Sequence, residues 1–378
     1  MSPESPKRRR LNRGGQSNRQ SQSFLERLQT LQNLNPDNMS QPRYPYAYGK
    51  LPFHVDWEVW RVDKYGLNTS LGLDNVENFL PALREHSKNP KLLWSLLRSR
   101  AALNQLSSKT AGFPQPSSAR AWEIIESKGW KDGRVHFSLK LNCADNGACS
   151  YEPKPIYIAS SCRAYRKFGS DRFLTVKIPE KGMYKFAKKI TEFIKQPISA
   201  CGRTYRVFFI KASSAHYFAT EGPGLEDKDI SLRDLMEWLI ALNHNSKMTA
   251  PKLFSRIGLS LSSTIPTIVF TPDQIHLVDD ITSPFGECMT DGCARMSPAV
   301  ARELWQSGML GSKETPTAVQ ARIGGAKGVW YVDPLADPRS EEMWIQIRRG
   351  SQLKFKHDPV AFQDPSLRTL VYLFHLDD

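Results

Sequence analysis

The chain has 378 residues, of which 40% are hydrophobic and 10% aromatic, and its formal net charge is +14. This composition is globular and excludes a chain that is disordered throughout. The basic balance favours a polyanionic partner such as nucleic acid, because phosphates neutralised by Lys and Arg release counterions. A basic protein without such a partner is the alternative. Six cysteines without a CxxC pair exclude a disulfide scaffold and a zinc finger, and predict reduced thiols.

The first 45 residues are rich in Ser, Asn, Gln, Arg and Pro, and predict a disordered basic tail. Within it, Lys7 to Arg10 resembles a nuclear import signal, and an arm that contacts RNA is the competing interpretation. The start of the chain lacks the apolar stretch of a secretory signal, and no run reaches the ~18 apolar residues of a membrane span. We therefore expect an intracellular protein of the nucleus, the cytoplasm or both, without a membrane partner.

From Tyr46 the pattern is globular and mixed. A helix is predicted over residues 90–106, a strand over 173–178, a second helix over 183–194 and a strand over 203–210. Four lysines lie away from the apolar face of the helix at 183–194, and we interpret them as a solvated surface, with contact to RNA phosphates as the alternative. These lysines are Lys185, Lys188, Lys189 and Lys195.

The last part of the chain predicts short strands around one helix. Ser231 first caps a helix whose third position is Asp234. After Pro251, strands are predicted at residues 267–270, 275–278, 329–332 and 344–347, separated by Pro, Gly and Asp. Ser297 as cap and Pro298 at the first position open the helix between them. This arrangement indicates a small β barrel.

Five blocks of sequence resemble, in order, the polymerase domain of the eukaryotic RNA-silencing RNA-dependent RNA polymerases, of the fungal quelling type. They are residues 168–174 (FGSDRFL), 202–209 (GRTYRVFF), 252–262 (KLFSRIGLSLS), 289–297 (MTDGCARMS) and 318–329 (AVQARIGGAKGV). The resemblance covers residues 160–370 and implies an α+β fold that contains the first of two double-psi β barrels. The chain would then be the N-terminal portion of such an enzyme, without the second barrel.

The domains implied are a disordered basic tail at 1–45, a helical or mixed N-terminal domain at 46–155, a mostly helical slab and linker at 156–264, and the first barrel at 265–378. Family resemblance places Arg322, Lys327 and Lys354 at barrel positions that face the active-site cleft, where they would bind RNA or nucleotide phosphate. Arg348 belongs to the same predicted set. In this interpretation Gly324, Gly325 and Gly328 let the backbone approach a ligand closely.

The glycine-rich segment at residues 324–328 has two other interpretations. A P-loop is excluded because Gly328 stands where its Ser or Thr would follow the lysine. In the second, Gly324 and Gly325 form a tight hairpin and Lys327 is solvated. The family's usual proline is replaced by Gly350 after Arg349, which adds freedom to the backbone and makes the placement of Lys354 less certain than that of Lys327.

The family's chemistry rests on an Asp-x-Asp-Gly-Asp loop that holds Mg²⁺ for nucleotidyl transfer, and this chain has no such loop. Asp279 and Asp280 are adjacent on a strand-like segment, so their side chains should point to opposite faces. Asp291, in an Asp-Gly turn signature, is assigned a structural role. We expect no catalytic or metal-binding residue in this chain, with Mg²⁺ required by the complete enzyme. A premature stop, a retained intron or an incomplete gene model would each produce such a chain.

The resemblance implies an enzyme that copies a single-stranded RNA template from nucleoside triphosphates into double-stranded RNA for silencing, with silencing-pathway proteins as further partners. This chain alone is predicted to be inactive. One alternative is a non-catalytic RNA-binding protein that modulates silencing. Another is a product that does not fold alone, because a barrel without its sister would expose an apolar face.

Overall fold

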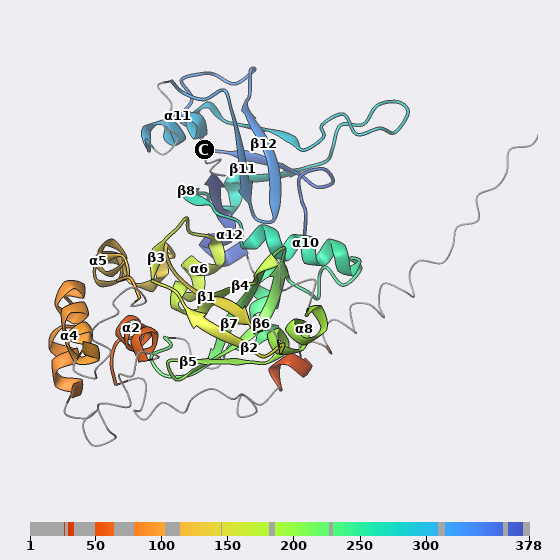
Figure 1. Ribbon diagram of the computed structural model, residues 1–378. Coiled ribbons are helices and arrows are strands. Elements are labelled where there is room, and N and C mark those ends of the chain that lie inside the picture. Colours follow the sequence, from red (N-terminus) through yellow and green to blue (C-terminus); the bar gives the residue numbers. More distant parts are fainter. Residues whose placement is uncertain are drawn as a thin grey trace, which may run out of the picture.

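The computed structural model describes residues 26, 29–33, 50–63, 79–102, 114–144, 146–180, 186–226, 230–308, 314–357 and 362–372. Most of the predicted basic tail, including Lys7 to Arg10, lies outside these residues, as does Lys185. The described part contains two seven-stranded sheets. Helices surround the first sheet, and the second sheet lies above it on the far side of helix α10 (Figure 1).

The first sheet is built on a parallel pair that antiparallel strands extend on both sides. Its strand order is β2-β1-β4-β7-β6-β5, with β3 also paired to β1, and β1 and β4 run parallel. The buried residues of β4 and β6 form continuous apolar stretches, which is typical of strands covered on both faces. The strands are β1 (Val135–Cys143), β2 (Cys149–Pro153), β3 (Tyr157–Ile158), β4 (Phe173–Lys177), β5 (Ile198–Ala200), β6 (Arg203–Lys211) and β7 (Ser214–Glu221).

Helices cover both faces of this sheet, and local signals in the sequence start several of them. Ser231 and Asp234 form the capping box that opens α9, as predicted. The apolar face of α9 and that of α10 then pack on the aromatic residues of β4, β6 and β7. The helices of this part are α2 (Phe53–Asp63), α4 (Pro90–Ala102), α5 (Ala119–Lys128), α6 (Arg163–Phe168), α8 (Ala187–Lys195), α9 (Leu232–Ile240) and α10 (Ala250–Ser260).

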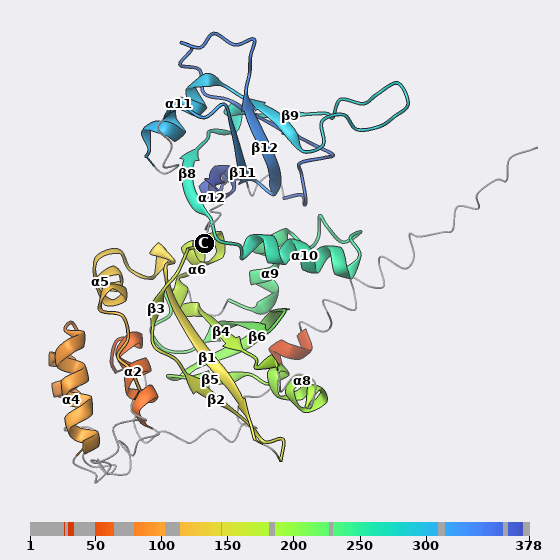
Figure 2. The ribbon, with the colours of Figure 1, turned by 45° about the horizontal axis from the view of Figure 1, so that its top comes forward.

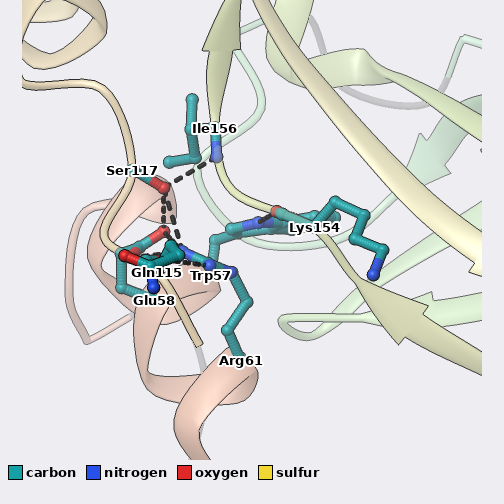
Figure 3. A network of polar contacts seen from close by, with 7 residues as sticks. All are labelled: Trp57, Glu58, Arg61, Gln115, Ser117, Lys154 and Ile156. Atoms are coloured by element: carbon teal, nitrogen blue, oxygen red, sulfur yellow. Dashed lines mark hydrogen bonds and ion pairs between the residues drawn. The ribbon is translucent and has the colours of Figure 1, made fainter. Parts of the chain in front are cut away.

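A buried ion pair ties α2 to the rest of the N-terminal part (Figure 3). Arg61 Nη1 lies 2.7 Å from Glu58 Oε2, and both side chains are at most 1% exposed. Ser117 donates its hydroxyl proton to Glu58 and accepts the backbone N–H of Ile156 at 2.7 Å, so the pair also fixes the segment that leads to β3. Protein groups therefore neutralise the Glu58 carboxylate, while Arg61 Nε has no partner among the described residues. Removal of either side chain would leave the charge of the other buried alone.

The second sheet has the strand order β8-β14-β11-β12-β10-β13-β9 and mixes parallel with antiparallel pairs. Helix α11 (Pro298–Gln306) opens at Ser297 and Pro298 as predicted. It packs on a core around Phe270 and Trp330, which are both fully buried. The strands are β8 (Ile265–Val269), β9 (Ile275–Val278), β10 (Cys293–Met296), β11 (Ala318–Ile323), β12 (Ala326–Val332), β13 (Ile345–Arg348) and β14 (Thr369–Tyr372), and the short helix α12 (Pro365–Arg368) precedes β14.

The mixed α+β class predicted from the sequence is confirmed. The described part of residues 156–264, which we expected to be mostly helical, contains the helices α6, α8, α9 and α10 together with the strands β3 to β7. The strands predicted at 173–178 and 203–210 are present as β4 and β6, whereas the sequence did not predict β3, β5 and β7, which pair with strands distant in the sequence or extend the sheet at its edge. The six cysteines are free thiols, as expected. Among the described residues, no helix combines the length and apolar character that crossing a membrane requires.

Candidate phosphate-binding site

The hairpin of β11 and β12 brings Arg322 and Lys327 directly opposite each other. The two residues of its turn, Gly324 and Gly325, have φ of +51° and +83°, the left-handed values that such a turn requires. A Cβ on Gly325 would lie 2.7 Å from the carbonyl oxygen of Phe355. The close backbone approach predicted at these glycines is therefore made by the protein itself, within a tight hairpin.

Arg322 is only partly satisfied by protein groups. Its Nη1 donates to the carbonyl oxygen of Leu259 at 2.7 Å, which fixes the guanidinium beside the C-terminal end of α10. Its Nε is buried and has no hydrogen-bond partner among the described residues. Burial lowers the pKa of the guanidinium, and an unpaired buried donor of this kind is costly unless a ligand accepts from it.

Lys327 is half-buried, neither fully solvated nor enclosed. Burial lowers the pKa of its ammonium, and the positive charges of Arg322, Lys354 and Arg256 lower it further, in that order. No carboxylate lies within 4.0 Å of the ammonium in the described part of the chain. We call Arg256, Arg322, Lys327 and Lys354 the cation cluster. Four cations without an acid between them form a site of positive potential that favours an anion.

Lys354 joins the cluster through its backbone. Its N–H donates to the carbonyl oxygen of Gly325 at 2.9 Å, beside the isolated bridge between Ala326 and Leu353. Its ammonium donates to the carbonyl oxygen of Ser351 at 2.6 Å. That single neutral acceptor holds the side chain against the turn at residues 349–351 and leaves its charge uncompensated. The geometry of Lys354 therefore depends on that turn.

Asp280 fixes the turn at residues 349–351. Its Oδ2 accepts the backbone N–H groups of Gly350 and Ser351, each at 2.9 Å, and its Oδ1 accepts the hydroxyl of Thr290 at 2.7 Å. Burial opposes ionisation, but these bonds and the hydroxyl of Ser351 prevail and lower the pKa of Asp280 to about 2. Hydrogen bonds thus supply the rigidity that a proline would have supplied covalently. A proline at position 350 has no N–H to donate to Asp280.

The other predicted site residues lie apart from the cluster. Arg348 is buried and donates to the carbonyl oxygens of Asp279, at 2.6 Å, and Cys293, so its guanidinium bonds to protein backbone. At Gly328, a Cβ would overlap the carbonyl oxygen of Gly292, so this glycine permits the close approach of β12 to the turn that precedes β10. Asp291, with φ of +34°, lies in the predicted turn. Asp279 and Asp280 follow the end of β9 and lie outside the strand. Both contact the turn at residues 349–351, Asp279 through Arg349 and Asp280 through the backbone N–H groups of Gly350 and Ser351.

A pocket of about 50 Å³ lies between the hairpin turn and the C-terminal end of α10. Arg322, Lys327 and Arg163 line it together with hydroxyls that include those of Ser262 and Thr264. Like Arg322, Arg163 has a buried Nε without a partner among the described residues. Sequence reasoning missed Arg163 and Arg256, because neither lies in the glycine-rich segment and no local signal distinguishes them from other surface cations. The fold brings Arg163 into the pocket and the charge of Arg256 close to Lys327.

No metal centre is formed by the described residues, which contain no group of three or more His, Cys, Asp or Glu that could hold an ion. The donor set of the pocket is cationic and suits a phosphate oxygen, whereas Mg²⁺ requires carboxylate or carbonyl oxygens. Mg²⁺ does not fit this site. That the complete enzyme uses Mg²⁺ stays a prediction.

Comparison with known proteins relates this fold to one family. The family model described as RNA dependent RNA polymerase matches residues 149–371. The solved structure of the RNA dependent RNA polymerase QDE-1 from Thielavia terrestris is similar with a TM-score of 0.70 and 30% sequence identity, over 88% of this chain and 37% of that chain.

Two curated relatives are plant proteins. The probable RNA-dependent RNA polymerase 1 of Oryza sativa subsp. japonica is 25% identical over 46% of this chain and 22% of its own length. The RNA-dependent RNA polymerase 6 of Arabidopsis thaliana is 28% identical over 38% of this chain and 12% of its own length. The chain thus spans less than a quarter of either plant relative and about a third of the solved fungal structure.

Proposed function

This chain belongs to the RNA-dependent RNA polymerase family, and we propose that it supplies the phosphate-binding part of an enzyme of this family. That enzyme would copy single-stranded RNA into double-stranded RNA for silencing. The resemblance found in the five sequence blocks is confirmed at the level of the family, and the similarity to fungal QDE-1 agrees with the fungal type expected. The observation that carries the proposal is the apposition of Arg322 and Lys327 on one hairpin without a neutralising acid.

The second sheet is proposed to be the first of two double-psi β barrels, over residues 265–378, and the first sheet with its helices the slab at 156–264. Support comes from the parallel pairs β10–β12 and β13–β9, which the second sheet combines with antiparallel pairs beside one apolar core. Residues 46–155 would be the separate N-terminal domain. The basic tail at 1–45 would act as an arm for RNA or as a nuclear import signal, with the nucleus or the cytoplasm as location.

The chemistry of the cation cluster suits RNA or a nucleoside triphosphate. The ammonium of Lys327 neutralises a phosphate as a point charge on a flexible stem, and the planar guanidinium of Arg322 can donate to phosphate oxygens through Nε, which is without a partner. Lys354, held by the turn that Asp280 fixes, adds a third charge. Arg348 bonds to backbone carbonyls, so we assign it the role of holding β13 in place, and a role in phosphate binding stays a prediction.

The catalytic acids are proposed to lie on polypeptide outside this chain. Asp279 and Asp280 are both used in structural contacts, and Asp291 serves a turn. The chain alone should therefore bind RNA and incorporate no nucleotide. To test this, the purified chain is mixed with single-stranded RNA, nucleoside triphosphates and Mg²⁺. Robust incorporation would contradict the proposal that the acids are absent.

The binding site is tested by the Lys327→Ala variant, with Lys91→Ala on α4 as a matched control far from the cluster. We expect Lys327→Ala to weaken the binding of single-stranded RNA about tenfold, and to reduce the slope of log K against log salt by about 0.7, since one phosphate contact is lost. Fluorescence anisotropy at several salt concentrations measures both. Equal loss in the two variants, or no loss in either, would remove Lys327 from the site.

A second function, an RNA-binding protein that modulates silencing without catalysis, rests on the same cluster and the net charge of +14. The two functions differ in what the neighbouring polypeptide does. If the reading frame beyond Asp378 encodes an Asp-x-Asp-Gly-Asp loop, the polymerase interpretation holds. If it ends there in the mature transcript, the non-catalytic function is favoured.

A further inference from the structure

Three lysines that do not belong to the cation cluster form a row across the first sheet. Lys140 on β1 is paired in register with Lys177 on β4. Lys177 is in turn paired with Ser214 on β7, and Ser214 is paired with Lys211 on β6. Register partners share one face of a sheet at intervals of about 4.8 Å. The hydrogen bond from Lys177 Nζ to Ser214 Oγ, at 3.2 Å, agrees with this placement. We call Lys140, Lys177 and Lys211 the lysine row.

The lysine row is exposed and lacks acidic partners. All three side chains are exposed, and none lies within 4.0 Å of a carboxylate among the residues that the structure describes. The acid nearest in register is Glu152, opposite Lys140 on β2, and its Oε1 already lies 2.7 Å from the ammonium of Lys154. A solvated row of like charges across neighbouring strands is destabilising unless a polyanion covers it.

Aromatic rings and helix α10 connect the lysine row to the cation cluster. Two residues before Lys211 on the same face of β6, the ring of Phe209 lies 4.6 Å from that of Phe254 on α10, and Phe254 is 39% exposed. Farther along α10, Arg256 contributes to the potential at Lys327. Figures 1 and 2 both show α10 between β6 below and the hairpin of β11 and β12 above.

From this continuity we infer that the lysine row, Phe254 and Arg256 form a track along which a single strand of RNA runs between the first sheet and the cation cluster. The inference rests on the proposed function and adds the path that the strand takes outside the site. Single strands are bound in general by basic grooves that follow the backbone and by aromatic rings on which bases stack. A half-exposed Phe254 between two groups of cations offers both, whereas a duplex would keep its bases stacked inside.

The test compares two triple variants of the full chain. The first variant, called the track variant, combines Lys140→Glu, Lys177→Glu and Lys211→Glu and reverses the charge of the lysine row. Lys88→Glu, Lys91→Glu and Lys128→Glu make the same change of net charge at exposed lysines in or beside α4 and α5, on the other side of the molecule in both views. Each variant is titrated with oligouridylates of about 6 nucleotides, which the cation cluster can hold alone, and of about 24 nucleotides, which would also reach the row.

We expect wild-type protein to bind the longer RNA at least tenfold more tightly than the shorter one. The track variant should lose this gain, keep its affinity for the short RNA within about twofold, and reduce the salt slope for the long RNA by about 2, since three phosphate contacts disappear. Phe254→Ala should weaken binding of the long single strand and leave that of a duplex of equal length unchanged. Thermal unfolding checks that each variant is folded, and the single Lys177→Gln variant replaces the triple one if it is not.

Other outcomes separate this inference from the proposed function. Equal losses in the track and control variants, or no gain from the longer RNA, would overturn the track while Lys327→Ala still weakens binding of the short RNA. Loss of all RNA binding by the wild type would overturn both. Binding to phosphatidylserine vesicles in place of RNA, reversed by the track variant, would make the surface a membrane contact and refute the inference.

Discussion

Two clusters of charge in this chain differ in how they are neutralised. In the N-terminal part, Arg61 and Glu58 are buried together and matched by hydrogen bonds to protein groups. In the second sheet, Arg322 and Lys327 lie opposite each other and are half-buried, with further cations beside them. No carboxylate of the described residues lies within 4.0 Å of the Lys327 ammonium. The matched cluster holds the fold together. The unmatched cluster opposes folding, as sites kept for a ligand commonly do, and the proposed function assigns the compensating charge to RNA.

The largest expected effect breaks the matched cluster. Glu58→Ala leaves the guanidinium of Arg61 buried without its carboxylate, so we expect the free energy of unfolding to fall by about 3–5 kcal/mol. The exposed pair of Arg120 and Glu123 has the same residue types and the same spacing. Glu123→Ala should therefore cost less than about 1 kcal/mol. Urea unfolding of both variants measures the contrast, and similar losses would show that burial is not what distinguishes the pair.

A smaller effect on stability is expected at Asp280. Its charge accepts hydrogen bonds from protein groups, as in the matched cluster, but these donors are neutral. Asp280→Ala should lower the free energy of unfolding by about 1–3 kcal/mol, since the N–H groups of Gly350 and Ser351 lose their acceptor. Asp279→Ala is the control, because Asp279 is 85% exposed and makes one surface ion pair with Arg349. The Asp280 variant should also bind RNA more weakly, since Lys354 loses its fixed turn.

The pH dependence of this contact has a definite sign. The pKa of Asp280 in the folded chain, about 2, lies below its ordinary value of 3.8. The contribution of the Asp280 carboxylate to the free energy of unfolding is therefore present above about pH 4 and disappears as the pH falls toward 2. The difference in unfolding free energy between wild type and Asp280→Ala should shrink over that window. A difference that stays constant down to pH 2 would contradict the assigned hydrogen bonds.

The smallest expected effect is an increase in the free energy of unfolding, caused by a substitution at Lys327. Lys327→Met removes one of four like charges, so it should raise the free energy of unfolding by up to about 1 kcal/mol while weakening RNA binding. Added salt should stabilise wild-type protein more than the variant, because it screens the repulsion that the variant lacks. Thermal unfolding at low and high salt measures this. A destabilised Lys327→Met variant would mean that the ammonium has a partner within the fold.

The sequence predicted what local chemistry determines. Ser231 and Ser297 start helices where expected, and Gly324 with Gly325 forms the hairpin that one of the interpretations described. It did not predict that β14 pairs between β8 and β11, or that Asp280 bonds to a turn 70 residues away. These contacts depend on the complete fold, because side-chain periodicity reports which face of an element is buried and not what covers it.

The candidate site was predicted to a similar degree. Family resemblance identified Arg322, Lys327 and Lys354, which the structure brings around one turn. Arg163 lines the pocket beside Arg322 and Lys327, and Arg256 on α10 adds its charge to the potential at Lys327. Both lie on helices that the sequence marked only as core elements. Their contribution became visible only through the unpartnered Nε groups that they share with Arg322.

The most direct test of the account is the pKa of the Lys327 ammonium, followed by NMR of lysines labelled at Cε, with Lys327→Arg to assign the signal. In the free chain this pKa should lie below 10.5, the ordinary value of a lysine, because burial and three neighbouring cations disfavour the charge. Addition of single-stranded RNA should raise it, since a phosphate stabilises the ammonium. A pKa at the ordinary value in the free chain, or one that saturating RNA leaves unchanged, would contradict the claim that this cluster binds phosphate.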